Sequence, residues 1–344
     1  MRLDGSLTEV DLARVPAEAK ALEQTGFDGA FSGELARDPF LPLAIAAEHT
    51  HRLDLGTSVA IAIPRNPMHV AQTAHDLQAA SRGRFILGLG SQVRGHIERR
   101  FGLEWSRPTA RMREFVLALQ AIWRCWNDRT PLGFTGEFYR HTLMTPMFDP
   151  GPNPHGRPRI FLAAIGPRMA EVAGEVADGV LLHSFASEHY IRSTMLPALQ
   201  RGLDASGRGR DEIEVSCPAL VVTGATEQTM AEAIEHTRDH IALYGSTPGY
   251  RRVLDAHGWG DLQGELNTLL KQDRHGDMRS LISDDIVEAF VVQGTPGEIP
   301  AKITARFGDI ADRISLRGAP PAFVPDWIQT LRRETRTPTA SAGP

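Results

Sequence analysis

A strand, a helix and a second strand follow one another early in the chain with almost no spare residues, and this arrangement constrains the fold most. The first strand covers residues 53–59, and Asn66 with Pro67 then opens a helix as an N-cap followed by proline. Residues 83–90 hold a second strand, whose residues 85–87 are a short continuous apolar run, and they end in glycines. Such a unit predicts parallel strands, and parallel α/β sheets bind ligands at the carboxyl ends of their strands.

Further strand and helix pairs repeat this order along the whole chain. The expected strands cover residues 1–6, 27–32, 53–59, 85–87, 159–163, 179–182, 214–222 and 313–316. A helix with an unusually aromatic buried side is predicted from Thr109, and another begins at Gly166-Pro167. Eight strands alternating with helices favour an α/β fold of the TIM (β/α)8 barrel type with insertions over a doubly wound sheet.

The length fits one barrel domain over residues 1–330. Residues 127–157 are rich in Pro, Gly and Asn and have little periodicity, so they are interpreted as an insertion. Residues 245–290 form a second insertion whose elements the sequence does not order. Residues 331–344 are expected to be a disordered tail because the end of the chain is small and polar.

The composition excludes several classes of function. The chain has 37 basic and 42 acidic residues and a net charge of −5, so no nucleic-acid partner is expected. Cys125 and Cys217 are far apart and indicate neither a disulfide framework nor a metal site, which favours a cytoplasmic protein. No segment has the roughly 18 apolar residues that cross a membrane. His49 and His51 lack a set of carboxylate partners, so no metal is expected.

Several sequence blocks spread over nearly the entire chain resemble the luciferase-like monooxygenase superfamily. The blocks are Gly26-Phe27-Asp28, Leu55 through Val59, Gly83 through Ser91, Gly166-Pro167-Arg168-Met169, Ala177-Asp178-Gly179-Val180, and Gly294 through Glu298. Residues 92–102 are most similar to the branch that uses the deazaflavin coenzyme F420. The resemblance implies a bacterial luciferase-like TIM barrel, usually a homodimer, that binds a flavin or deazaflavin ring at the carboxyl ends of its strands.

The resemblance also implies cofactor-binding residues. Relatives carry a non-proline cis peptide bond that corresponds to Ser58–Val59 and that presses against the back of the ring. The alternative is an ordinary trans strand end. Gly90 and Ser91 would let the backbone approach the ring or its side chain, or would serve tight packing alone. Val93 stands where a dinucleotide fingerprint needs its third glycine, so a Rossmann site is not favoured.

A phosphate site is predicted where the strand ending before Ile165 turns into a helix. The amides of Gly166, Arg168 and Met169 would lie at the positive end of that helix, while Pro167 fixes the turn. The alternative is a plain helix start.

The candidate proton-transfer residues are His96, Glu34 and Gln92. His96 is of the residue type most often used for proton transfer, and it lies in a polar loop expected to cover the ring. Relatives have a glutamate in this loop, where this chain offers Gln92, His96 and Glu98. Glu34 follows the second strand, where relatives place a group near the reactive carbon. Asp4 and His183 also follow strand ends, and for both a structural hydrogen bond is the favoured role.

The resulting hypothesis is an F420-dependent oxidoreductase that transfers a hydride between the deazaflavin and a small organic substrate. One alternative is an FMN-dependent luciferase-like monooxygenase. A second alternative, from a different class, is a non-catalytic protein that binds flavin or deazaflavin. The identity of the substrate and the direction of the reaction depend on loops that the sequence does not order.

Overall fold

A computed structural model describes residues 1–334, and these form two compact units. The larger unit comprises Asp4–Leu181 and Leu196–Glu214. The smaller unit comprises Met1–Leu3, Leu182–Met195 and the chain from Val215 onward.

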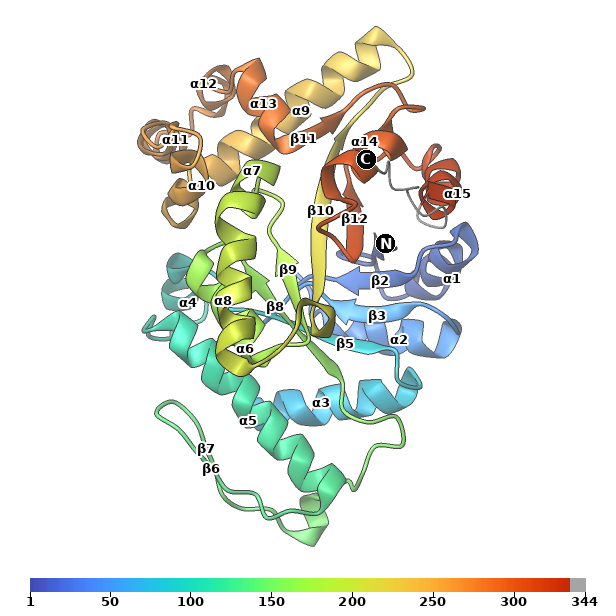
Figure 1. The fold of residues 1–344 in the computed structure, drawn as a ribbon, viewed down its shortest axis with the longest axis vertical. Helices are drawn as coiled ribbons and strands as arrows, with labels where there is room; N and C mark the ends of the chain where they lie inside the picture. Colours follow the sequence, from blue (N-terminus) through green and yellow to red (C-terminus); the bar gives the residue numbers. More distant parts are fainter. Residues whose placement is uncertain (335–344) are drawn as a thin grey trace, which may run out of the picture. The chain divides into compact units, whose positions relative to one another are not determined.

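The strands of the larger unit follow the predicted order. They are β1 (Arg2–Ser6), β2 (Gly29–Ser32), β3 (Asp54–Thr57), β5 (Phe85–Gly90), β8 (Arg159–Ala164) and β9 (Gly179–Leu182), with a short β4 (Ala60–Ile61). Strands β1, β2, β3, β5 and β8 pair in parallel in that order, β9 follows β8, and β4 pairs with β5. Figure 1 shows β2, β3 and β5 side by side.

Helices connect these strands, as parallel pairing requires. They are α1 (Val15–Thr25), α2 (Phe40–His49), α3 (Pro67–Ala80), α4 (Arg94–Arg99), α5 (Pro108–Asp128), α6 (Pro167–Val176) and α8 (Leu196–Ser206). The Asn66 side chain accepts a hydrogen bond from the Met68 amide at 2.9 Å, so it caps α3 as expected. The aromatic side of α5 is buried, and the Trp123 indole donates to the Ala71 carbonyl of α3 at 3.2 Å.

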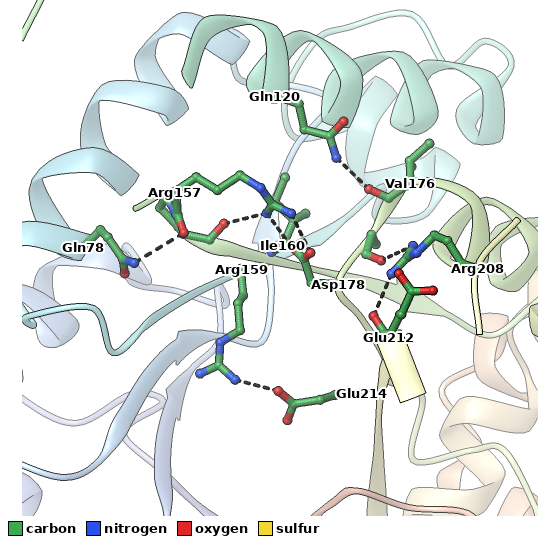
Figure 2. A network of polar contacts seen from close by, with 12 residues as sticks. Gln78, Gln120, Arg157, Arg159, Ile160, Val176, Asp178, Arg208, Glu212 and Glu214 are labelled. Atoms are coloured by element: carbon green, nitrogen blue, oxygen red, sulfur yellow. Dashed lines mark hydrogen bonds and ion pairs between the residues drawn. The ribbon is translucent and has the colours of Figure 1, made fainter. Parts of the chain in front are cut away.

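Ion pairs join the first residues of several strands (Figure 2). The Arg159 guanidinium lies 2.9 Å from the Asp54 carboxylate and 2.6 Å from that of Glu214. Arg157 binds both carboxylate oxygens of Asp178 at 2.6 and 2.7 Å, and Asp178 also accepts the Ile160 amide at 2.8 Å. The amino ends of these strands are therefore occupied by structural ion pairs, and their carboxyl ends are where a site is expected.

The smaller unit contains β10 (Glu214–Val222) between β11 (Val291–Gln293) and β12 (Arg313–Arg317), all parallel. Its helices are α7 (Glu188–Tyr190), α9 (Glu227–Gly245), α10 (Arg251–Asp255), α11 (Leu262–Lys271), α12 (His275–Ser280), α13 (Asp284–Phe290), α14 (Ile299–Phe307) and α15 (Val324–Glu334). In this unit a π-helical turn covers Ile191–Met195 and a short 3-10 turn covers Pro248–Tyr250; the 3-10 turns at Pro146–Phe148 and Arg210–Glu212 belong to the larger unit.

The predicted strands agree with the structure, but several connections differ. The expected polar loop after Gly90 contains α4, because Ile97 packs against Ile61 and Ile63. The insertion at 127–157 contains an antiparallel hairpin of β6 (Phe134–Thr135) and β7 (Arg140–His141).

The segments near the carboxyl terminus also differ from the prediction. Residues 245–290 form α10 to α13, and β11 follows as a strand that was not predicted. Residues 331–334 were expected to be disordered but belong to α15, where Leu331 is buried. The rest of the expected tail, 335–344, lies outside the described residues. The single domain over 1–330 stays a prediction.

Within residues 1–334, no helix is both long and apolar enough to cross a membrane. The same part of the chain holds no group of three or more His, Cys, Asp or Glu side chains that could bind a metal ion.

Candidate functional site

An apolar surface lies at the carboxyl ends of β3, β5 and β8 in the larger unit. Below it, Phe31, Ile86, Phe161 and Leu181 form a buried cluster. Val59 and Ala163 pack on this cluster and keep part of their surface exposed. A ligand at these strand ends would therefore meet two small apolar side chains on a rigid, filled base.

The peptide bond between Ser58 and Val59 is cis, as the resemblance implies. The backbone on either side of it is fixed by hydrogen bonds from the preceding strand and loop. The Ser58 amide donates to the Ser32 carbonyl at 2.8 Å, and the Glu34 amide donates to the Val59 carbonyl at 3.2 Å. The position of the Val59 side chain is thus determined from both sides.

Glycines of β5 allow this segment to approach closely. A Cβ at Gly90 would lie 2.6 Å from Cγ2 of Val59 and 3.7 Å from Cβ of Ala163. A Cβ at Gly88 would lie 1.8 Å from the carbonyl oxygen of Thr57, whose hydroxyl donates to the Gly88 carbonyl at 2.6 Å. The glycine-rich exit of the strand is therefore required for packing, and the buried backbone of Gly90 lies between the partly exposed side chains of Val59 and Ala163.

The amino terminus of α6 lies beside this surface. Leu89 of β5 pairs with Leu162 of β8, so the exits of these two strands are neighbours. Gly166 is the N-cap and has no side chain to cap the helix, Pro167 occupies its first turn, and that turn carries no acidic residue. The positive end of α6 is therefore not neutralised by a carboxylate of its own first turn.

Two of the three amides predicted for phosphate binding are available. No described residue bonds to the amides of Gly166 and Arg168, whereas the Met169 amide donates to the Gly166 carbonyl at 3.1 Å. The prediction of a free Met169 amide is wrong, because a tight turn at the helix start uses it. Ile165 leads into this turn and is partly buried.

Gln92 and Ser91 form a tight turn after β5. Gln92 has a positive φ of 62°, and its side-chain oxygen accepts the Val93 amide at 2.9 Å. The Ser91 hydroxyl donates to the Gln92 carbonyl at 3.2 Å. Both polar groups therefore stabilise the turn, and the proton-transfer role of Gln92 stays a prediction.

His96 lies exposed on α4 and not in a loop over the apolar surface. The buried side of α4 is formed by Ile97, the next residue along the helix. Glu98 is bound to Arg94 at 2.8 Å on the exposed side. No contact of either residue with Val59 is found within residues 1–334, and the proton-transfer role of His96 and Glu98 stays a prediction.

Glu34 is partly buried and engaged in a network. Its Oε2 accepts the Ile61 amide at 2.8 Å and lies 2.6 Å from the Arg65 guanidinium. Since its own amide binds the Val59 carbonyl, Glu34 holds the 59–61 segment on both sides. This geometry gives Glu34 a positioning role, while no described contact places it at a reacting atom.

In the smaller unit, His183 directly follows β9 and packs in a cluster of aromatic rings. Its ring contacts Tyr244 edge-on at 4.9 Å and Tyr250 at 4.7 Å between centroids. Burial, together with the charges of Arg317 and His240, lowers the pKa of His183 to about 4. Burial and the neighbouring Tyr244 raise the pKa of Tyr250 to about 12. Both groups are therefore neutral at physiological pH.

The sequence interpretation missed Tyr244, Tyr250 and Arg317. The 245–290 segment had no recognisable order, so Tyr250 could not be assigned to any strand end. The spacing of His236, His240 and Tyr244 by four residues does place them on one helical side, which was a usable signal. Asp4, also expected near a strand end, is buried within β1.

Parallel strands alternating with helices, together with a site at the carboxyl ends of those strands, define a (β/α)8-barrel enzyme. The sequence profile of the luciferase-like monooxygenase family matches residues 2–313, and the chain belongs to this family. The predicted luciferase-like TIM barrel is thereby confirmed.

This protein is an oxidoreductase, as are those of its relatives whose names state an activity. A 5,10-methylenetetrahydromethanopterin reductase of Methanolobus tindarius is 27% identical and covers 83% of this chain and 84% of its own. A Mycobacterium tuberculosis protein is 52% identical over 91% of this chain and 92% of its own. The coenzyme F420-dependent tetrahydromethanopterin reductase of Methanopyrus kandleri has the same fold, with a TM-score of 0.78, 21% identity and 97% coverage of both chains.

Proposed function

We propose that this protein is an F420-dependent oxidoreductase that transfers a hydride between the deazaflavin and a small organic substrate. The proposal is carried by the partly exposed side chains of Val59 and Ala163, which lie on either side of Gly90, and by the uncapped start of α6 in the neighbouring loop. A flat ring with a phosphorylated side chain needs both features in neighbouring loops. The F420-dependent reductase of the same fold and the resemblance of residues 92–102 support F420 over other ring cofactors.

The residues present fit such a cofactor. The ring would lie on the Val59 side chain. A residue larger than glycine at position 90 would collide with that side chain. Gly166 and Arg168 would donate their amides to a phosphate, with Ile165, Pro167 and Met169 shaping the turn. Ser58 and Ser91 would flank the ring through their backbone. When bound, F420 supplies the hydride, and the chain's own residues bind and orient it.

Binding measurements with two cofactors test the proposal. The purified protein is titrated with F420 and with FMN, and binding is followed by fluorescence. We expect F420 to bind in the micromolar range or tighter, and FMN to bind more weakly. Tight binding of FMN without binding of F420 would favour the flavin monooxygenase and overturn the proposal. Failure to bind either cofactor would overturn it as well.

A homodimer, a cytoplasmic location and a small-molecule substrate are part of the same proposal. Sedimentation of the purified protein would test the dimer, with a single species at the monomer mass as the contrary result.

A further inference from the structure

Large apolar side chains are exposed on the stretch of residues 140–150, in the insertion between α5 and β8 of the larger unit. Leu143 is 76% exposed, Met147 87% and Phe148 64%, and all three lie within six consecutive residues. Apolar side chains scattered singly over a surface are common. A group of this size is typical of a surface that another molecule covers.

Both ends of this stretch are fixed to α5, and Figure 1 shows the hairpin of β6 and β7 next to that helix. At the beginning, the Tyr139 amide donates to the Glu114 carboxylate at 2.6 Å, and the Tyr139 hydroxyl accepts from Arg111 at 3.1 Å. At the end, the Asp149 carboxylate lies 2.8 Å from the guanidinium of Arg129, which directly follows α5. The apolar side chains are therefore carried by a segment that is held in place.

Between these anchors the chain turns once and stays open to solvent. The Phe148 amide donates to the Thr145 carbonyl at 2.9 Å in the 3-10 turn that starts at Pro146. The exposed residues of the stretch are Arg140, Thr142, Leu143, Pro146, Met147, Phe148 and Pro150. The anchored backbone thus presents a mainly apolar edge to water.

Exposed charges of opposite sign lie at the two ends of the stretch. Arg140 follows the anchor at Tyr139, and Asp128 is the last residue of α5, directly before the anchor at Arg129. Neither Arg140 nor Asp128 forms an ion pair within residues 1–334. Glu114 and Asp128 are roughly four helical turns apart on α5, which corresponds to about 20 Å. The apolar side chains therefore lie between an unpaired basic group and an unpaired acidic group.

This distribution complements itself across a two-fold axis. A two-fold interface joins the same patch on both copies, so the patch must match its own image. When two such stretches meet antiparallel, apolar side chains face apolar side chains, and Arg140 of each copy comes opposite Asp128 of the other. A lipid surface is a poorer match, because the stretch carries one arginine and the chain has a net charge of −5.

The exposed area also fits a dimer. The exposed fractions of Leu143, Met147 and Phe148 leave on the order of 400 Å² per copy, so two copies in contact would bury about 800 Å² from these residues alone. Stable interfaces bury about 1,200–2,000 Å² in total. The flanking exposed residues, Thr142, Pro146 and Pro150 among them, can supply the difference.

We propose that the 140–150 stretch is the interface with a second copy of this chain, with Leu143, Met147 and Phe148 at its centre and Arg140 paired with Asp128 of the other copy. The proposal rests on the homodimer that is part of the proposed function, and it names the surface that forms it. The anchored stretch is exposed in a single chain and becomes buried in the dimer.

Sedimentation velocity of the full chain over a range of protein concentrations is the first test. We expect the wild type to be a dimer and Met147→Glu to raise its dissociation constant at least about thirtyfold, because two charges are buried in an apolar centre. The matched control is Leu243→Glu, which makes the same change at an exposed position of α9 in the smaller unit. The control should dimerise like the wild type, and circular dichroism should show both variants folded.

The outcomes separate the interface from the proposed function. A dimer of Met147→Glu as tight as that of the wild type would overturn this interface and leave the homodimer standing. A wild type that is monomeric at every concentration would overturn both the interface and the homodimer. Neither result depends on a cofactor, so the F420 titration decides separately on the oxidoreductase function.

A charge exchange tests the antiparallel pairing. We expect Arg140→Asp and Asp128→Arg each to raise the dissociation constant of the dimer at least about tenfold, because each places like charges opposite one another. The variant with both substitutions restores opposite charges and should dimerise within about threefold of the wild type. Unchanged affinity in both single variants, or a doubled loss in the combined variant, would overturn the pairing.

Vesicle flotation tests a lipid surface as the occupant, with vesicles of phosphatidylcholine and phosphatidylglycerol. The wild type should remain in the unbound fraction. Flotation of the wild type that is lost in Met147→Glu and kept in Leu243→Glu would assign the stretch to a membrane and overturn the proposal.

Discussion

Gly90 lies directly against Val59: a Cβ at position 90 would come within 2.6 Å of the Val59 Cγ2 atom. Val59 is β-branched and therefore has few rotamers with which to avoid the contact. The hydrogen bonds from the Glu34 amide to the Val59 carbonyl and from the Ser58 amide to the Ser32 carbonyl restrict its backbone as well. Gly90 at the end of β5 and Val59 after β3 are thus packed against each other, and neither position can change in size without displacing the other.

Replacing Gly90 by alanine should therefore disturb the surface proposed to hold the ring. We expect Gly90→Ala to destabilise the fold by about 1–3 kcal/mol, as overpacking does, and to weaken F420 binding at least tenfold. Urea unfolding and a fluorescence titration measure the two effects.

The control for this change is Gly264→Ala in α11, where a Cβ would meet nothing within 4 Å. Alanine should stabilise that helix by up to about 1 kcal/mol and leave F420 binding unchanged. Gly90→Ala with wild-type affinity for F420 would show that Val59 does not support the ring.

The partly buried ion pair of Glu34 and Arg65 should contribute strongly to stability. The side chains are 9% and 21% exposed, so removing the arginine leaves a carboxylate with little access to water. We expect Arg65→Met to lower the free energy of unfolding by about 2 kcal/mol. The comparison is Arg94→Met, whose pair with Glu98 is 71% and 37% exposed and should cost at most about 0.5 kcal/mol. Equal losses in the two variants would argue against the positioning role of Glu34.

The sequence predicted the parts of the fold that depend on local signals. The capped helix after Asn66 and the strand from Phe85 were recognisable because a helix cap and an apolar run each depend only on residues that are adjacent in the sequence. The amino-terminal residue of α6 was recognisable for the same reason, since Gly166 and Pro167 are adjacent.

The remaining features depend on tertiary contacts. Helix α4 forms where a loop was expected because Ile97 has distant partners, Ile61 and Ile63. The engagement of Glu34 with Arg65 joins residues 31 positions apart. The hydrogen bond between His183 and Tyr250 joins residues 67 positions apart, so no local sequence pattern predicts it.

The stability of the protein should depend on pH through His183. Its pKa falls to about 4 in the folded state, chiefly because of burial, so the unfolded state binds a proton first as the pH falls below about 6.5. Stability is therefore lost progressively between pH 6.5 and 4, by at most about 3 kcal/mol from this residue. His183→Gln should show a shallower loss over the same range in urea unfolding at pH 7, 6, 5 and 4.5. If the free energy of unfolding fell equally with pH in the wild type and in His183→Gln, the lowered pKa of His183 would be contradicted.

A carboxylate placed at the start of α6 should separate helix stability from phosphate binding. Arg168 is exposed in the first turn, next to the unpaired amides of Gly166 and of Arg168 itself. Arg168→Glu puts a negative charge at the positive end of the helix, so it should stabilise the fold by about 0.3–1 kcal/mol. The same charge repels a phosphate at those amides, so the affinity for F420 should fall about tenfold or more, and the loss should shrink at high salt.

The matched control for Arg168→Glu is Arg192→Glu in the smaller unit, which changes the net charge equally but lies away from α6 in the sequence and pairs with Asp309. This control should lose stability, because it replaces an ion pair by a repulsion, and should keep its affinity for F420. If Arg168→Glu is stabilised and binds F420 as tightly as the wild type, the phosphate does not lie at Gly166. The opposite signs of the two effects make the outcome independent of any general damage to the fold.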